Sequence, residues 1–277
     1  MSARDSSETD SYETIEVRVD DHLCWLTLNR PKALNAMNRQ LVTDLRDFLA
    51  KLPERRDIRV VIMRGAGRAF CAGLDLKEAS APGGAGSDGN RVTAGLRGQR
   101  RIAELVIAMR RAPQPFIACV RGPASGGGFA LALAADVRIA GETARMNAAF
   151  IRVGLSACDI GVSYFLPRLV GASLASELLL TGRFINAERA LARGLVSDVV
   201  PDDQLDAAGE SLAREILSNS PLGVRLTKEA LAMSLDAGSL EQVIAMEDRN
   251  QILCAQSPDV IEGMTAFLEK RTPEYCD

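Results

Sequence analysis

The chain has 277 residues, a length that fits one large domain or a domain with an appendage. Hydrophobic residues make up 47% and charged residues 25% of it, which is the balance of an ordinary globular protein. The net charge of -3 gives no indication of a nucleic-acid surface. No stretch approaches the ~18 consecutive apolar residues of a membrane span, so we expect neither nucleic acid nor a bilayer as a partner.

The polar residues 1–11 lack an apolar core, so they are expected to be disordered and are not a secretory signal. The six cysteines form no CxxC pair, and the chain has a single histidine. This composition argues against a zinc site and indicates reduced thiols, hence a cytoplasmic location. The cysteines are Cys24, Cys71, Cys119, Cys158, Cys254 and Cys276.

The N-terminal part predicts strands followed by a helix. ETIEVRV and HLCWLTLNR indicate two strands joined by a hairpin turn at Asp20-Asp21. Residues 38–51 have helical spacing with Asn38 as the cap. IRVVIMRG, residues 58–65, is almost continuously apolar, as expected of a strand in a sheet covered on both faces.

The middle of the chain continues this alternation. Residues 79–98 are rich in glycine and small residues and predict a mobile loop, either a surface insertion or a lid over a site. A helix near 99–111 and the strand FIACVRG follow, and then a glycine run that opens a helix before the strand VRIAG.

Beyond residue 171 the pattern is helical, with polar starts and glycine stops. We expect three parts in total: a disordered N-terminus over 1–11, a core of strand–helix units over 12–200 that carries the active site, and a helical region over 201–277.

Residues 125–136, SGGGFALALAAD, place three glycines against an apolar run. A helix N-terminus leaves backbone N–H groups unpaired and carries partial positive charge, and glycine lets a ligand approach closely. The FALALAA run is apolar nearly all round, which predicts a buried helix. Such a helix, aiming N–H groups at a cavity, is suited to stabilise an oxyanion.

Two further motifs make the pattern specific. GAGRAFCAGLDL, residues 65–76, lacks the third glycine of a dinucleotide fingerprint. Together with NRPKALNAMN (29–38), the glycine run, LTGRFINAERALARGLVSDVV and AFLEKR, it resembles the crotonase family, the enoyl-CoA hydratase/isomerase superfamily. The motifs follow family order over roughly residues 15–271.

The resemblance implies an α/β fold: a crotonase-like right-handed spiral of ββα turns with a C-terminal helical trimerisation region. It implies a homotrimer or a dimer of trimers that acts on acyl-CoA thioesters and needs no cofactor beyond the coenzyme A of the substrate. Two peptide N–H groups, which fall on Leu74 and Gly127, would stabilise an enolate oxyanion. Both roles use the backbone, so the side chain at position 74 matters little.

The family pattern also assigns contacts with coenzyme A. Phe267 and Lys270 match a C-terminal segment that often reaches the ligand from a neighbouring subunit. Taken alone, Lys270 and Lys32 would each be interpreted as a solvated charge. The remaining contacts fall on Lys32, Ala33, Leu34, Ala36, Ala72, Asp75 and Leu76.

The sequence departs from the family's hydratases at both catalytic glutamates, which fall on Ala130 and Phe150. Neither side chain can transfer a proton. Asp159 lies nearby, in a setting similar to that of the dienoyl-CoA isomerases but with one extra residue after Gly154. Asp159 is therefore either a general base with a raised pKa or the cap of a helix that begins near Val162, and the two roles are compatible.

Other polar side chains near the motifs have simpler interpretations. Asp136 ends the buried helix and is expected to be structural, and Asp75 is expected to brace the backbone of its turn. Cys158 has no histidine or lysine in view to lower its pKa, so a buried, inert thiol is expected.

Three functions are compared. The first is an acyl-CoA enzyme with isomerase-like or other single-acid chemistry through Asp159, and the second is a catalytically impaired acyl-CoA-binding protein of the same fold. The third is a serine peptidase, because Ser125 begins a helix and the Clp-type peptidases share the spiral. That mechanism requires a histidine base, and the only histidine, His22, lies at the hairpin.

Overall fold

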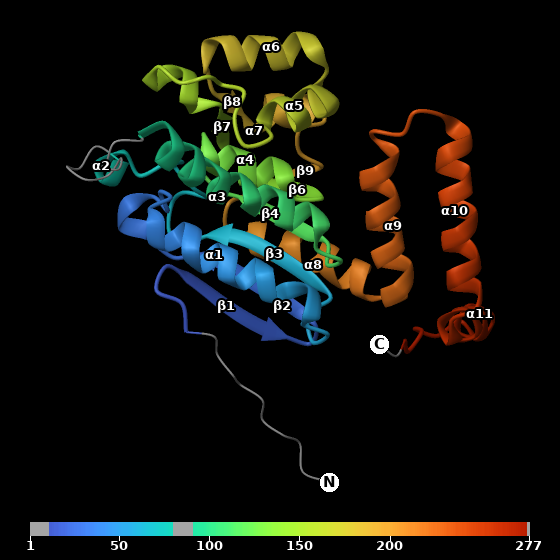
Figure 1. The fold of residues 1–277 in the computed structure, drawn as a ribbon. Helices are drawn as coiled ribbons and strands as arrows, with labels where there is room; N and C mark the ends of the chain where they lie inside the picture. Colours follow the sequence, from blue (N-terminus) through green and yellow to red (C-terminus); the bar gives the residue numbers. More distant parts are fainter. Residues whose placement is uncertain (1–10, 80–90, 276–277) are drawn as a thin grey trace.

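The computed structural model describes residues 11–79 and 91–275. Its larger sheet has six strands, and their order follows the order of the chain (Figure 1). The first two strands are antiparallel, and every later neighbour is parallel, so each later strand is reached by a crossover. The strands are β1 (Ile15–Asp20), β2 (Leu23–Leu28), β3 (Val60–Gly65), β4 (Phe116–Val120), β6 (Val137–Gly141) and β9 (Asp198–Val200).

Both faces of the larger sheet are apolar and covered. In β3, Val61 and Met63 pack into the core beneath the helices on one face, while Val60 and Ile62 belong to the core on the opposite face. This alternation explains the continuous apolar run in the sequence. The first face is covered by α1 (Arg39–Lys51), α3 (Arg91–Arg111) and α4 (Gly127–Ala134), and the second by α8 (Leu205–Leu217).

A smaller sheet follows the carboxyl end of β4. It consists of β5 (Pro123–Ser125), β7 (Arg145–Asn147) and β8 (Ile185–Asn186). An isolated bridge joins Cys71 to Ala124, so the chain after β3 runs beside β5 and reaches the beginning of α4.

Shorter elements complete this part of the molecule. They are the 3-10 helices η1 (Pro31–Ala33), η2 (Leu52–Glu54) and η3 (Ala149–Val153), and the α-helices α2 (Leu76–Ala79), α5 (Val162–Val170), α6 (Ala172–Thr181) and α7 (Ala187–Ala192).

Three C-terminal helices stand to one side of the sheets (Figure 1). They carry many exposed apolar side chains, including those of Leu231, Ile252 and Phe267. Because α8 packs on the sheet, only these three project from the body of the fold. They are α9 (Pro221–Ser234), α10 (Leu240–Ala255) and α11 (Pro258–Glu269).

The elements agree with the predicted order, with two corrections. The hairpin turn is formed by Asp21 and His22, which have positive φ angles of 45° and 64°, because Asp20 still pairs with Leu23. The helix expected near residue 99 begins at Arg91, so residues 91–98 of the predicted loop are helical. Residues 80–90 of that loop, and nearly all of the predicted N-terminal disordered segment, lie outside the described residues.

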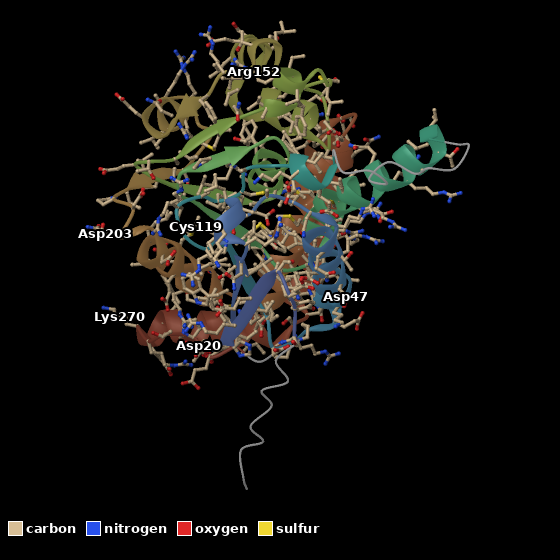
Figure 2. All side chains as sticks on the ribbon, turned by 90° about the vertical axis from the view of Figure 1, so that its left-hand side faces the viewer. Asp20, Asp47, Cys119, Arg152, Asp203 and Lys270 are labelled. Carbon is tan, nitrogen blue, oxygen red and sulfur yellow. The ribbon has the colours of Figure 1, made fainter. Side chains whose placement is uncertain are left out.

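Burial separates the interior from the surface as expected of a globular chain. Cys119 lies within the protein and is 1% exposed, whereas Lys270 lies at the edge of the molecule (Figure 2). In the described part of the chain, no helix combines the length and the apolar character needed to cross a membrane.

Candidate active site

Among the residues that the structure describes, the N–H group of Leu74 has no hydrogen-bond partner. The amides of Ala72 and Asp75 both donate toward the segment at 34–37, with N···O distances of 2.9 and 3.0 Å. Residues three apart cannot face the same way in a regular strand, and the alternation breaks at Gly73, whose φ is 92°. The amide of Leu74 therefore faces away from Met37, its bridge partner, and donates to no acceptor in the described residues.

The glycine run forms the tip of α4, as predicted. Gly127 is the first helical residue, and a Cβ on it would lie 2.7 Å from Sδ of Met37. A Cβ on Gly128 would lie 2.2 Å from the carbonyl oxygen of Cys71, so only glycine fits there. All eight residues of α4 are buried. Three glycines thus allow a fully buried helix to begin directly against the segments at 37 and 71.

The structure brings the two predicted amides into one neighbourhood. A Cβ placed on Gly73 would lie 3.5 Å from the amide nitrogen of Gly127. The N–H of Gly127 is in the first turn of α4 and, like that of Leu74, has no acceptor among residues 11–79 and 91–275. Two neighbouring unpaired donors, one at a helix N-terminus, can both donate to a single anionic oxygen.

The positions of the two missing glutamates are occupied by apolar side chains. Ala130 is fully buried in the first turns of α4, and Phe150 is 9% exposed. The Phe150 ring lies against Gly126, since a Cβ there would be 3.5 Å from it. Neither Ala130 nor Phe150 therefore offers the site a group that can donate or accept a proton.

Asp159 lies in the loop before α5 and close to the tip of α4. Its neighbour Ile160 reaches to 3.7 Å from the position of a Cβ on Gly127. Oδ1 of Asp159 accepts from the amide of Ile160 at 2.8 Å and from Nε2 of Gln99 on α3. Burial raises the pKa of Asp159, and these two hydrogen bonds only partly oppose that effect.

The predicted cap of α5 is not formed by the side chain of Asp159. The N-cap residue is Gly161, and no described side chain caps the helix. The backbone carbonyl of Asp159 accepts from Val162 at 2.9 Å, while the carboxylate turns back to its own neighbour, Ile160. The carboxylate of Asp159 therefore does not cap α5, which was the structural role that the sequence left open.

The predicted contacts with coenzyme A at 32–36 and 72–76 form one surface. The amide of Ala72 donates to the carbonyl of Leu34 at 2.9 Å, which holds the two segments side by side. Lys32 and Leu76 are exposed, and Ala33, Ala36 and Ala72 are half-buried. Small side chains and a cation thus border a single exposed strip.

One residue that sequence reasoning missed holds this strip in place. The side-chain amide of Asn35 donates to the carbonyls of Ala66 and Ala69 at 3.0 and 2.8 Å, and its oxygen accepts from the amide of Arg30 at 2.9 Å. Asn35 has a positive φ of 56°, which asparagine tolerates better than most residues. The position of Asn35 in the NRPKALNA motif was the only sequence signal for this structural role.

Asp75 braces its turn, as predicted. Its carboxylate lies 3.0 Å from the guanidinium of Arg30, which also donates to the carbonyl of Ala36, and it accepts from the amide of Glu78 at 3.4 Å. Burial would raise the pKa of Asp75, but the hydrogen bonds from Arg30 and Glu78 outweigh it and lower the pKa. The carboxylate is therefore a structural anion beside the strip.

Phe267 and Lys270 are not brought to this strip within one chain. They lie in and just after α11, which packs against α10, on the opposite side of the molecule from α2 (Figure 1). Phe267 is 84% exposed.

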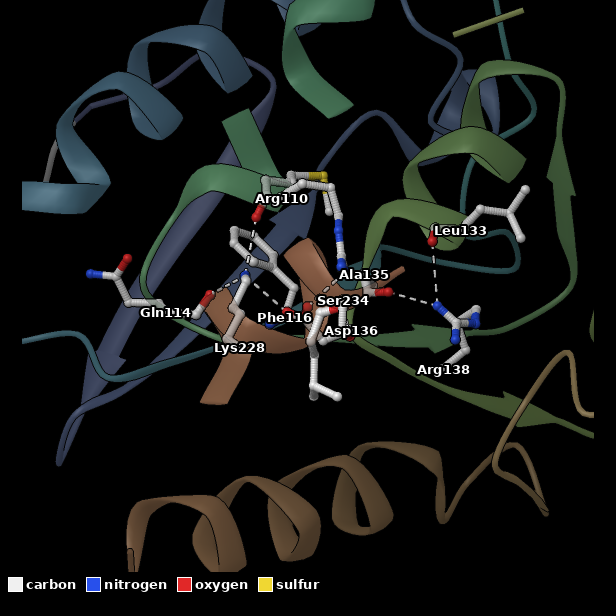
Figure 3. A network of polar contacts seen from close by, with 11 residues as sticks. Arg110, Gln114, Phe116, Leu133, Ala135, Asp136, Arg138, Lys228 and Ser234 are labelled. Carbon is white, nitrogen blue, oxygen red and sulfur yellow. Dashed lines mark hydrogen bonds and ion pairs between the residues drawn. The ribbon is translucent and has the colours of Figure 1, made fainter. Parts of the chain in front are cut away.

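Asp136 has the structural role predicted for it. It accepts from Arg110 at 2.8 Å and from the amide of Phe116 at 2.8 Å, and it lies 2.9 Å from Nζ of Lys228 (Figure 3). Arg138 donates to the carbonyl of Ala135 at 2.6 Å, next to the end of α4. These contacts fix the end of the helix whose beginning carries Gly127.

The remaining predictions concern nucleophiles. His22 is exposed at the amino end of β2, whereas Ser125 follows the carboxyl end of β4, so the two lie at opposite ends of the sheet. A serine–histidine pair is therefore not formed. The prediction that Cys158 is buried was wrong: its side chain is exposed, in the segment between η3 and α5. Burial raises the pKa of Cys71, beneath the site, to about 12.

Comparison with known proteins identifies the family. The model of the enoyl-CoA hydratase/isomerase family matches residues 18–277, and the chain belongs to this family. The fold is accordingly the crotonase-like α/β fold, and the protein is an enzyme of the hydratase/isomerase class.

Individual relatives agree with this assignment. The chain is 40% identical to the probable enoyl-CoA hydratase EchA12 of Mycobacterium tuberculosis, over 91% of this chain and 88% of the relative. It is 35% identical to the 1,2-epoxyphenylacetyl-CoA isomerase of Escherichia coli, over 95% and 98% of the two chains. The solved enoyl-CoA hydratase of Bacillus anthracis has a TM-score of 0.87 and 36% identity, covering 95% of this chain and 99% of the other.

Proposed function

We propose that the protein binds an acyl-CoA thioester and stabilises its enolate with the amides of Leu74 and Gly127. The observation that carries this proposal is the pair of neighbouring N–H groups at the kink of Gly73 and the tip of α4, which have no acceptor in the described part of the chain. Each preorganised donor to a developing oxyanion contributes roughly 3–4 kcal/mol in the transition state. Burial of α4 and the contacts at its end keep the second donor rigid.

Coenzyme A lies along the strip formed by residues 32–36 and 72–76. The small side chains of Ala33, Ala36 and Ala72 let the ligand approach the backbone, and Lys32 supplies a positive charge for its phosphates. No further cofactor takes part.

Phe267 and Lys270 reach the ligand from a second copy of the chain. Their distance from the strip within one chain and the exposed apolar side chains of α9–α11 support a homotrimer or a dimer of trimers. In this proposal the strand–helix units over 12–200 form a right-handed spiral and the region from 201 assembles the subunits. Light scattering tests the assembly, and a monomer at micromolar concentration would contradict it.

Asp159 is the single proton carrier, because Ala130 and Phe150 cannot exchange protons. Oδ2 of Asp159 removes a proton from a substrate carbon, so the C–H bond breaks, an O–H bond forms, and the electron pair moves into the thioester enolate. The same carboxyl group returns the proton to a different carbon, which shifts a double bond. This cycle requires no water and fits isomerisation better than hydration.

An apolar cavity beside Asp159 is the place for the acyl group. It has a volume of about 410 Å³ and lies between α3 and α5. Apolar residues make up most of its lining, and Arg110, Arg111 and Tyr164 also border it. Its size and apolar lining suit an alkyl or aryl substituent.

The proposed reaction is tested by incubating the protein with enoyl- and dienoyl-CoA esters and following the thioester absorbance. Asp159→Asn keeps the shape of the side chain and abolishes turnover. Asp47→Asn, which alters an exposed carboxylate on α1 that pairs with Lys51, leaves it unchanged. Equal kcat in the Asp159 variant and the parent would remove Asp159 from the mechanism.

The alternative is a catalytically impaired acyl-CoA-binding protein of the same fold, and the apolar residues at positions 130 and 150 favour it. Calorimetry with a non-reactive acyl-CoA analogue separates the outcomes. Binding without turnover of any ester would support the alternative, and the absence of binding at millimolar ligand would contradict both functions.

A further inference from the structure

Gln99 is the only described side chain that donates a hydrogen bond to the carboxylate of Asp159. It belongs to α3, whereas Asp159 lies 60 residues further on, in the loop before α5. Both donors, Nε2 of Gln99 and the amide of Ile160, bond to Oδ1. Within residues 11–79 and 91–275 no donor reaches Oδ2, so one oxygen is held while the other keeps its lone pairs free.

The placement of Gln99 follows from the periodicity of α3. Gln99, Ala103, Val106 and Arg110 recur at helical spacing and therefore share one face. The last three line the cavity that Ile160 and Gly161 close from the other side. The face of α3 that borders the acyl cavity thus carries Gln99 at the end where the carboxylate lies.

The chemistry of the donor suits a general base. A neutral amide orients a carboxylate without the strong stabilisation of the anion that an arginine or lysine would give. Two cations on the packed elements are engaged elsewhere: Arg110 pairs with Asp136, and Arg168 of α5 pairs with Asp236 at 3.0 Å. Arg100, next to Gln99 on α3, is exposed, and no hydrogen bond from it to Asp159 is formed within the described residues. Arg111, at the far end of the cavity lining, is twelve residues along α3 from Gln99, or about 18 Å of helix.

We propose that Gln99 is a positioning residue that holds Oδ1 of Asp159 so that Oδ2 faces the substrate carbon. This inference rests on the proposed role of Asp159 as proton carrier. It assigns to α3 a part in proton transfer in addition to lining the acyl cavity.

The first test measures Asp159 itself and needs no turnover. Carbon-13 NMR of the side-chain carboxyl groups follows the titration of Asp159, whose signal is assigned by its loss in Asp159→Asn. Gln99→Leu removes a donor to the charged form, so the pKa of Asp159 rises, and Gln99→Arg adds a positive charge, so the pKa falls. Opposite shifts from one position cannot result from loss of structure, and an unchanged titration in both variants would overturn the proposal.

The second test is kinetic. Gln99→Leu lowers kcat about tenfold with little change in KM, and the acidic limb of kcat/KM moves to higher pH. Gln40→Leu is the matched control, because Gln40 makes the same kind of bond, at 2.8 Å, to Asp44 on α1. If Asp159→Asn abolishes turnover but Gln99→Leu leaves kcat and the pH profile intact, the positioning role alone is wrong. If Asp159→Asn retains activity, the proposed function is wrong.

Discussion

Lys228 of α9 places Nζ 2.9 Å from Asp136 at the end of α4, so one ion pair joins the C-terminal helices to the helix that carries Gly127. Nζ also donates to the carbonyls of Met109 and Gln114, at 3.1 and 2.7 Å, which uses its three protons. Lys228 is 6% exposed. The contact therefore couples the attachment of α9 to the rigidity of the proposed oxyanion site.

Removing the positive charge of Lys228 should lower the stability of the protein. Lys228→Met leaves two carbonyl groups without their donor and Asp136 with only Arg110 and a backbone amide, so the free energy of unfolding falls by about 2–4 kcal/mol. Chemical denaturation measures it. The exposed pair of Arg46 with Glu104, at 3.2 Å, is the control, and Arg46→Leu costs less than about 1 kcal/mol. Equal effects of the two substitutions would contradict the anchoring role.

Lys228 should also make the free energy of unfolding depend on pH, in a direction that its pKa shift determines. Burial lowers the pKa of Lys228, and Asp136 only partly opposes this. At a pH between the lowered pKa of Lys228 in the folded protein and its ordinary pKa in the unfolded chain, the unfolded chain binds more protons than the folded one. The contribution of Lys228 to the free energy of unfolding therefore rises with pH in this alkaline range. Denaturation as a function of pH should show this contribution in the parent and not in Lys228→Met, and parallel curves would refute it.

Gly127→Ala tests the helix tip directly. The new Cβ meets Sδ of Met37, a flexible side chain that can move, so the fold survives while the amide is displaced. We expect kcat to fall about 100-fold, the size of effect seen when one oxyanion donor is lost. Gly223→Ala, where the nearest atoms lie 3.6 Å away, should leave kcat unchanged. Full activity of the Gly127 variant with an unaltered melting temperature would argue against the role of this amide.

Ala103→Trp tests the acyl cavity. An indole from α3 fills much of the space next to Ile160, so KM for long-chain or aryl esters rises at least tenfold. Two-carbon to four-carbon esters provide the internal control, since they do not reach the cavity. A uniform change for all chain lengths would exclude this cavity as the acyl site.

The sequence predicted the parts of the fold that local patterns determine. Asn38 caps α1 by accepting from the amide of Leu41 at 2.9 Å, and the apolar run at 127–134 is a buried helix, as expected. The hairpin turn was misplaced by one residue, because the two strands pair through Asp20 and Leu23. Turn positions depend on pairing register, which the sequence alone does not determine.

The candidate site was predicted where it uses the backbone and missed where it depends on long-range contacts. Leu74 and Gly127 follow from two local motifs. Gln99 and Lys228 meet their aspartates across 60 and 92 residues of chain, and no local pattern signals such contacts. Asn35 was overlooked although it lies in the NRPKALNA motif, because its amide bonds to carbonyls more than thirty residues away.

The most direct measurement is a crystal structure of the protein with a non-reactive acyl-CoA analogue. We expect the thioester oxygen within about 3 Å of the amide nitrogens of both Leu74 and Gly127, with Oδ2 of Asp159 facing the carbons next to it. A thioester oxygen bound elsewhere, with either of these amides hydrogen-bonded to the protein itself, would contradict it.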